Sequence, residues 1–367
     1  MKFNAGIFDG HIHTHGGCGV DNYLRNIHDS LSAGGVDGQN LLCVRLASSN
    51  CITETEALLA KAMNPGKITV HCNPTFQISA FDTTPEGVAG QVQDFIDAGA
   101  DGVKLGDGNA GADVPLDSPV FDPMFDLMEK TGFPLLYHVG TTPYYPARRT
   151  YQKNRYPVAG FPRILYQPGG EDDDHEEYVG SYEYNEKKYE QIDNLLKRHP
   201  NLRVTFPHTY YLSDQLDRLA NFLDVHPNVM IDMTPCPEIY YNMSKDPVKS
   251  REFLCSYSNR VIFGTDNETE SDPMPILILM RQFFETDENF FAPRWGFDVN
   301  GLALPKHVLE DIYHNSFKKA CPGQELKSKK AAEFCEKIYD TVRDIEDLPE
   351  ANKQEVLECA RRFKKMA

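Results

Sequence analysis

Short apolar runs rich in β-branched and aromatic residues alternate with amphipathic helical stretches along most of this chain. This alternation is typical of βα units, in which each strand joins a parallel sheet and the next helix covers it. Eight such runs are present, and eight βα units can close into one barrel. The expected strands are Ala5–His13, Asn40–Ala47, Lys67–Phe76, Asp101–Gly106, Phe133–Gly140, Leu202–His208, Val229–Thr234 and Arg260–Asp266.

The helices expected between these strands have recognisable ends. Thr84 precedes a proline at the first helical position, which is a common helix start. The segments Arg198–Val204 and Val225–Ile231 repeat one order of helix end, His-Pro-Asn turn and strand, so we interpret His199 and His226 as structural turn residues. The expected helices are Thr53–Met63, Thr84–Ala98, Pro119–Thr131, Tyr189–Arg198, Leu212–Asp224 and Asp272–Glu285.

Two segments extend beyond a minimal barrel. Residues 141–190, between the fifth and sixth strands, form a long polar insertion, and insertions of this length are usually lids or arms. Residues 327–367 carry Lys and Glu at helical spacing, which predicts a helical extension that packs on the barrel or makes a dimer contact. The sequence therefore predicts an α/β fold: a (β/α)₈ TIM barrel over residues 1–326 with an insertion after strand five and a C-terminal helical extension.

Charge and composition exclude several classes of partner. The formal net charge of −17 argues against nucleic acid and against anionic membranes, because both require clustered Lys and Arg. The nine cysteines are an odd number without a C-x-x-C pair, so reduced, buried thiols are expected. The start of the chain does not resemble a signal peptide, and no apolar run is long enough to span a bilayer. We therefore expect a cytoplasmic protein that acts on a small molecule, as a homodimer or higher homo-oligomer.

Five titratable residues lie where barrel enzymes carry their chemistry. His11 and His13 alternate on the first strand, so both face the same side and can share one ion. His138, His208 and Asp266 each end an otherwise apolar strand, at the catalytic mouth of a barrel. A desolvated carboxylate or imidazole at such a position requires a partner or an ion. The five residues together predict a metal centre.

The chain also resembles the amidohydrolase superfamily, in particular its amidohydrolase-related branch, which includes aminocarboxymuconate semialdehyde decarboxylase. The resemblance covers residues 5–320 and depends on several motifs in the family's order. These are Asp9-Gly10-His11-Ile12-His13, Gly102-Val103-Lys104-Leu105, His138, His208, Gly264-Thr265-Asp266 and the closing segment Tyr313-His314-Asn315-Ser316.

The resemblance implies a ligand set and a metal. His11, His13, His138 and Asp266 would bind a divalent ion, most often Zn²⁺, with Mn²⁺ or Fe²⁺ as alternatives. The fifth residue, His208, would hold or protonate the reacting group in a mononuclear site or bind a second metal in a binuclear one. The resemblance leaves both arrangements open.

Lys104 bears on the number of metal ions. Its segment resembles that of dihydroorotases, in which a carbamylated lysine bridges two metals. The alternative is a plain lysine that pairs with a carboxylate or with a substrate anion.

The predicted activity is hydrolysis by metal-bound hydroxide of a C–N or C–O bond in an amide, lactone or ester of a small organic acid. Zinc with an open coordination position lowers the pKa of bound water to about 7. Asp266 would take the proton, and His208 would stabilise the developing oxyanion. The alternative is a metal-dependent, non-oxidative decarboxylase of an unsaturated or aromatic acid, because such lyases share this constellation.

Candidate substrate-binding residues follow two of the proposed ligands. Tyr144, Arg148 and Arg149 lie just after His138 and would suit an aromatic or carboxylated substrate, although a dimer contact is an equal alternative for this segment. Trp295, after the eighth strand, would complete the pocket on the same face.

Overall fold

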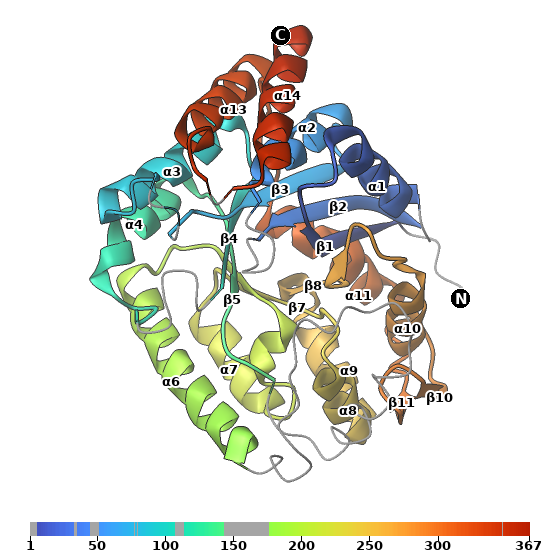
Figure 1. Cartoon of the computed structure of the whole chain (residues 1–367). Helices are drawn as coiled ribbons and strands as arrows, with labels where there is room; N and C mark the ends of the chain where they lie inside the picture. Colours follow the sequence, from blue (N-terminus) through green and yellow to red (C-terminus); the bar gives the residue numbers. More distant parts are fainter. Residues whose placement is uncertain are drawn as a thin grey trace.

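A computed structural model describes residues 6–32, 35–44, 51–76, 78, 80–106, 114–142, 176–346 and 348–367. Parallel strands form one curled sheet, and helices cover its outer surface (Figure 1). The sheet order is β8-β7-β6-β5-β4-β3-β2-β1-β9. The strands are β1 (Ile7–Thr14), β2 (Val36–Cys43), β3 (Ile68–Cys72), β4 (Gly102–Gly106), β5 (Leu135–His138), β6 (Val204–Phe206), β7 (Val229–Asp232), β8 (Val261–Ile262) and β9 (Asn267–Glu268).

The two strands at the ends of the sheet order are neighbours in the sequence: β8 lies within the predicted eighth strand, Arg260–Asp266, and β9 begins directly after it, at Asn267. Between β8 and β9, the carbonyl of Phe263 accepts a hydrogen bond from the Gly10 amide at 2.8 Å. The buried carboxylate of Asp9 accepts bonds from the amide and hydroxyl of Thr265 at 3.0 and 2.7 Å. Burial raises the pKa of Asp9 to about 6, although these hydrogen bonds act to lower it. These bonds join the first strand to the last, and the predicted (β/α)₈ barrel is confirmed.

The helices follow the expected alternation with some differences. Helix α1 was not predicted, because its buried Val20, Tyr23 and Ile27 have helical spacing but are separated by polar residues. The part of the predicted insertion from Glu176 onwards is helical, whereas residues 143–175 lie outside the described residues. The helices of the barrel are α1 (Val20–Ser32), α2 (Glu54–Met63), α3 (Pro85–Ala98), α4 (Asp122–Thr131), α6 (Glu176–Arg198), α7 (Leu216–Val225), α8 (Pro237–Lys245), α9 (Pro247–Ser256), α10 (Met274–Glu285), α11 (Lys306–Glu310) and α12 (Ser316–Ala320).

The start of β2 differs from the prediction because polar residues are buried in it. The strand begins at Val36 rather than at Asn40. Gln39 donates to the hydroxyl of Ser30 at 2.6 Å, and Asn40 donates to the carbonyl of Gly10 at 3.1 Å. Both amide nitrogens therefore have acceptors inside the protein, which helps to stabilise a strand of mixed polarity. The hairpin β10 (Asn289–Ala292) and β11 (Phe297–Asn300) forms a separate antiparallel pair.

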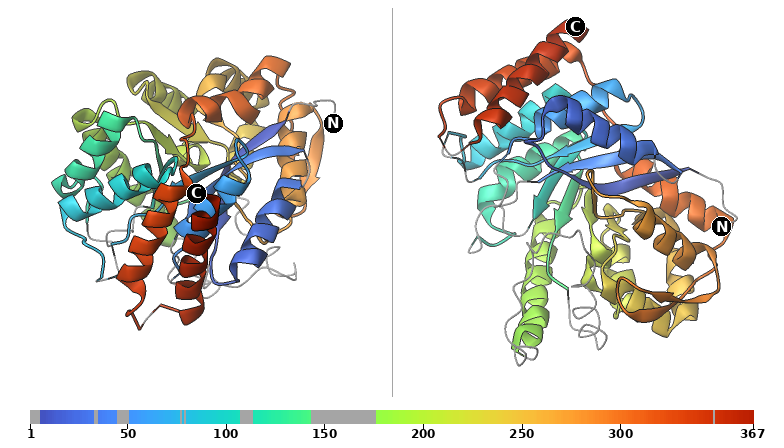
Figure 2. Two further views of the ribbon diagram at one scale, coloured as in Figure 1. Left: turned by 90° about the horizontal axis from the view of Figure 1, so that it is seen from above. Right: turned by 45° about the vertical axis from the view of Figure 1, so that its right-hand side comes forward.

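The C-terminal extension is a pair of helices, α13 (Ser328–Val342) and α14 (Glu350–Met366). They pack side by side against α3 and α2 on the outside of the barrel (Figure 2). Glu355 accepts hydrogen bonds from the amides of Gly17 and Gly19, and Asn352 bonds both the amide and the carbonyl of Ile52. The extension therefore fixes the loops that follow β1 and precede α2. Within the described part of the chain, no helix is both long and apolar enough to cross a membrane.

Two glycines permit close approach at the seam between the first and last strands. A Cβ on Gly10 would lie 2.6 Å from a methyl carbon of Ile262, and a Cβ on Gly264 would lie 2.7 Å from the Cβ of His11 and from the methyl carbon of Thr234. Carbon atoms in proteins do not approach this closely without displacement of one of them. Any larger residue at either position would push the two strands apart.

We therefore expect Gly264→Ala to lower the free energy of unfolding by about 1–3 kcal/mol through overpacking. Gly90→Ala is the matched control, because a Cβ there meets nothing within 4 Å and the residue lies inside the helix α3. Alanine is a better helix former than glycine by about 0.5–1 kcal/mol, so this variant should be more stable than the parent. Urea unfolding of the three proteins measures both effects, and equal stability of the parent and the Gly264 variant would contradict overpacking at the seam.

A buried carboxyl group beneath the C-terminal helices should make stability depend on pH. Glu56 is 1% exposed, and its Oε1 has no hydrogen-bond partner among the residues that the structure describes. Burial, together with the nearby Glu355, raises the pKa of Glu56 to about 8. The folded protein therefore keeps this proton at neutral pH, whereas the unfolded chain releases it above its ordinary value of 4.5.

This group's contribution to stability is complete below pH 4.5 and decreases as the pH rises toward 8, by about 1.4 kcal/mol per pH unit. Glu56→Gln, which is neutral at every pH, should remove this dependence and raise the urea midpoint at pH 8 more than at pH 5. The same substitution at the exposed Glu350 is the control. If the two variants showed the same pH profile, Glu56 would not be protonated in the folded protein.

Candidate metal centre

Three donor atoms, from the first strand and from the segment between β8 and β9, converge at the barrel mouth. His11 and His13 alternate on β1, and their Nε2 atoms are 3.2 Å apart. Oδ1 of Asp266 lies 3.2 Å from Nε2 of His11 and 3.0 Å from Nε2 of His13. Asp266 has a φ of 54°, in the left-handed region that only a few per cent of non-glycine residues adopt. The strained residue thus lies between β8 and β9, and its own carboxylate faces both imidazoles.

A second carboxylate orients His11 through the ring nitrogen on the side away from Asp266. Asp232, the last residue of β7, accepts a hydrogen bond from Nδ1 of His11 at 2.8 Å. This bond holds a proton on Nδ1 and orients the ring so that Nε2 faces Asp266. The other oxygen of Asp232 accepts the backbone amide of His208 at 2.9 Å. Asp232 therefore positions two of the predicted site residues.

Asp232 was not predicted as a site residue, although the sequence carries a signal for it. A carboxylate that ends an apolar strand was the signal for Asp266, and Val229–Asp232 has the same pattern. The expected strand was extended to Thr234, so Asp232 was placed inside it.

His208 begins a turn of unusual handedness. His208, Thr209, Tyr210 and Tyr211 all have φ between 51° and 56°, which makes one left-handed turn. This conformation costs roughly 1–2 kcal/mol per residue for L-amino acids, so surrounding contacts must hold it. One such contact joins the hydroxyl of Thr234 to Nδ1 of His208 at 3.0 Å. The turn was not predicted, because the segment contains no glycine.

The turn brings His208 and Tyr211 to the fifth strand. The ring centres of His208 and His138 are 5.2 Å apart, and those of His208 and His11 are 6.1 Å apart. The hydroxyl of Tyr211 lies 3.0 Å from Nε2 of His138. The five residues predicted from strand ends therefore gather at one place, with Tyr211 as an additional neighbour.

The pKa shifts describe a set of neutral imidazoles around ionised carboxylates. Burial lowers the pKa of His13 to about 4 and also lowers that of His138 and His208. Burial acts to raise the pKa of Asp266, but the hydrogen bonds from His11 and His13 hold it well below its ordinary value.

His11 shows where the site favours positive charge. Burial lowers its pKa, but the charge of Asp232 and the contacts with Asp266 outweigh burial and raise it. Two carboxylates thus stabilise one positive charge between them. Neutral imidazoles and a carboxylate are also the donors that divalent zinc, manganese and iron prefer. The residues present fit a bound divalent cation.

Lys104 lies beside this cluster. It is on β4 and 3% exposed, and its charge lowers the pKa of His13, His71 and His138. His71 itself is a buried core residue, whose Nδ1 lies 2.9 Å from the amide oxygen of Asn40.

Of the other predicted site residues, Trp295 is described and does not join the cluster. Trp295 is 1% exposed and packs in the core, with its ring centre 4.7 Å from that of Tyr240. An indole is largely apolar, so burial here gives it more favourable surroundings than the mouth of the barrel. Tyr144, Arg148 and Arg149 lie outside the described residues. His199 is a turn residue within ion-pair distance of Asp122, Asp126 and Glu129.

Comparison with solved structures shows the same fold at low sequence identity. An uncharacterised TIM-barrel protein from Bordetella bronchiseptica superposes with a TM-score of 0.55 at 13% identity, over 86% of this chain and 98% of that one. A 5-carboxyvanillate decarboxylase from Novosphingobium aromaticivorans, in complex with manganese and 4-hydroxy-3-methoxy-5-nitrobenzoic acid, gives a TM-score of 0.51 at 12% identity, over 86% and 96%. A search of curated proteins found no match.

A family model gives the sequence-level relationship. The model described as amidohydrolase matches residues 76–315, which is more than half of the chain and includes His138, His208, Asp232 and Asp266. The chain therefore belongs to the amidohydrolase family.

Proposed function

We propose that this protein is a metal-dependent hydrolase in which His11, His13, His138 and Asp266 hold one divalent cation, with zinc as the first candidate. The observation that carries the proposal is the convergence of three donor atoms, from residues 11, 13 and 266, within 3.2 Å of one another. When bound, such a cation polarises a carbonyl oxygen and lowers the pKa of water.

The residues around this position can carry out the proton transfers of hydrolysis. Water adds its oxygen to the carbonyl carbon of an amide, lactone or ester, and the C–N or C–O bond breaks. Asp266, held ionised by His11 and His13, accepts the proton that water loses and delivers it to the departing nitrogen or oxygen. The overall reaction consumes one water and releases a carboxylic acid and an amine or alcohol.

His208 and Lys104 are proposed to act on the substrate. The carbonyl and hydroxyl of Thr234 occupy Nδ1 of His208, so Nε2 is the ring nitrogen left for the substrate. In the imidazolium form, Nε2 donates to the carbonyl oxygen as negative charge develops on it. Lys104 places a buried positive charge near the same position, and this charge suits the carboxylate of a small organic acid. A plain, uncarbamylated Lys104 is therefore part of this proposal.

A second candidate is a decarboxylase of an aromatic or unsaturated acid. It is supported by the fold shared with a manganese-containing 5-carboxyvanillate decarboxylase and by the cationic Lys104 next to the cluster. In this reaction the C–C bond to the carboxylate breaks, CO₂ leaves and a proton is added to the carbon.

The metal proposal predicts that the purified protein contains one equivalent of a divalent ion by elemental analysis. Asp266→Asn should lose most of it, because the amide carries no charge and is a poor ligand. Asp232→Asn should bind the ion 10–100-fold more weakly, because the loss of the bond to Nδ1 releases the orientation of His11. Asp340→Asn, on the exposed surface of α13, is the control and should bind like the parent. A metal-free parent protein, or full occupancy in Asp266→Asn, would overturn the proposed ligand set.

The reaction class predicts which product appears when the metal-loaded protein acts on a library of small amides, lactones, esters and aromatic acids. Hydrolysis releases a carboxylic acid, which a pH indicator detects for esters and lactones; for amides the released amine takes up the proton, so an amine assay is used. Decarboxylation releases CO₂ and consumes a proton. We expect acid release, and His208→Asn should lower kcat/KM by 10²–10³-fold if this side chain stabilises the oxyanion. Release of CO₂ instead would establish the second candidate.

A further inference from the structure

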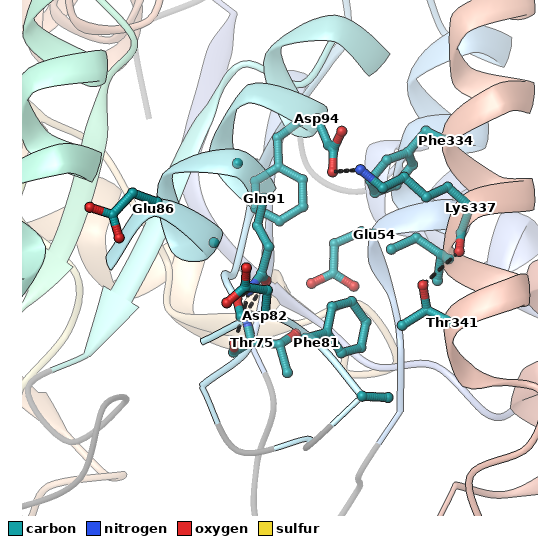
Figure 3. A pocket seen from close by; sticks show the side chains of 15 residues that line it. Glu54, Thr75, Phe81, Asp82, Glu86, Gln91, Asp94, Phe334, Lys337 and Thr341 are labelled. Atoms are coloured by element: carbon teal, nitrogen blue, oxygen red, sulfur yellow. Dashed lines mark hydrogen bonds and ion pairs between the residues drawn. The ribbon is translucent and has the colours of Figure 1, made fainter. Parts of the chain in front are cut away.

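A cavity of about 440 Å³ lies outside the barrel, between α3, the loop that precedes it and the C-terminal helix α13 (Figure 3). Its lining includes Glu54 from the start of α2, Phe81 and Gln91 from the loop and α3, and Phe334, Lys337 and Thr341 from α13. None of the described residues of the metal centre lines it. The cavity is therefore a separate feature, and a ligand bound in it would not depend on the proposed hydrolase activity.

Glu54 places a carboxylate at the centre of this cavity. The residue is 2% exposed, and its side chain points into the cavity (Figure 3). Its Oε2 accepts a hydrogen bond from the backbone amide of Thr53 at 3.1 Å. Glu54 is also the first residue of α2, where the helix dipole stabilises negative charge. A buried anion at this position favours a cationic partner.

The other charged residues that line the cavity are mostly negative, like Glu54. The lining contains four acidic residues, Glu54, Asp82, Glu86 and Asp94. Among the described lining residues the only cation is Lys337, and its ammonium lies 2.5 Å from the carboxylate of Asp94. The cavity thus has an excess of negative charge, which repels anionic ligands and attracts cations.

The walls next to Glu54 are aromatic. Phe81, Phe95 and Phe334 line the cavity, and the rings of Phe95 and Phe334 meet edge to face at 5.9 Å. Such walls bind apolar groups, and the faces of their rings also attract an ammonium ion. A bare metal ion would gain nothing from them, so the lining suits an organic cation.

The cavity is preformed. Gln91 accepts a hydrogen bond from the Thr75 amide at 2.8 Å and donates to the carbonyls of Thr75 and Asp82 at 3.1 and 3.0 Å. These bonds hold the loop wall in place against α3. A ligand that enters therefore does not have to order this wall, which reduces the entropic cost of binding.

We propose that this cavity is a binding site for a small organic ammonium ion that carries an apolar arm. The ammonium group lies at the Glu54 carboxylate, and the arm lies along Phe81 and Phe334. The site opens between the barrel and the C-terminal helices, so binding joins α2, α3 and α13.

Calorimetric titration with three compounds of one shape tests the charge requirement. The probe is 2-phenylethylammonium, and its comparators are the neutral 2-phenylethanol and the anionic 3-phenylpropionate. We expect the ammonium to bind at least about tenfold more tightly than the alcohol, the ratio that one charge-assisted hydrogen bond provides, and the anion not to bind. Equal binding of the three compounds, or no binding of the ammonium at millimolar concentration, would overturn the proposal.

Three variants locate the site. Glu54→Gln should weaken binding of the ammonium at least about tenfold and leave the alcohol unaffected. Glu350→Gln makes the same change at an exposed residue that does not line the cavity, and should bind like the parent. Gly90→Phe fills open space at the rim and should abolish binding, which keeps the test valid even if Glu54→Gln does not fold. Unchanged affinity in either Glu54→Gln or Gly90→Phe, with native circular dichroism, would place the ligand elsewhere.

Discussion

The buried contact between Asp232 and His11 is the interaction on which the geometry of the candidate metal centre depends. An isolated charge in this interior would cost several kcal/mol, so the carboxylate must be paired. It is paired on both sides, by the imidazole of His11 and by the backbone of His208. One group thus fixes the tautomer of a first-strand residue and the position of a sixth-strand residue. The orientation of Nε2 of His11 toward Asp266 follows from this arrangement.

Barrel closure provides the second constraint. His11 and Asp266 are far apart in the sequence and meet only because the first and last strands join through Asp9, Thr265 and the glycines between them. In an open sheet these strands would be the two edges, and the two ligands would be separated by its full width. The candidate donor set therefore exists only when the barrel is closed. Its members meet because the C-terminal ends of parallel strands lie at one face of the barrel.

Strand periodicity was sufficient to predict the barrel and to identify His11, His13, His138, His208 and Asp266 as neighbours, because the ends of apolar strands meet at one face. The periodicity argument failed where buried polar groups or strained backbone are stabilised by contacts with residues that are distant in the sequence. The start of β2 was placed too late because Gln39 and Asn40 are polar, and their hydrogen-bond partners come from other elements. The left-handed turn at His208 has no sequence signal, because tertiary contacts hold non-glycine residues there. Trp295 follows the eighth strand as expected of a pocket residue, but its apolar area is buried in the core.

The bonds from Glu355 to Gly17 and Gly19 join residues 338 and 336 positions apart. During translation the loop after the first strand leaves the ribosome long before α14 exists. The amides of Gly17 and Gly19 therefore stay hydrogen-bonded to water until α14 has been synthesised. Only a chain that includes α14 can make these two bonds. Ribosome stalling or proteolytic clipping before Glu355 would then release chains that contain every strand of the barrel but lack these bonds to the loop after the first strand.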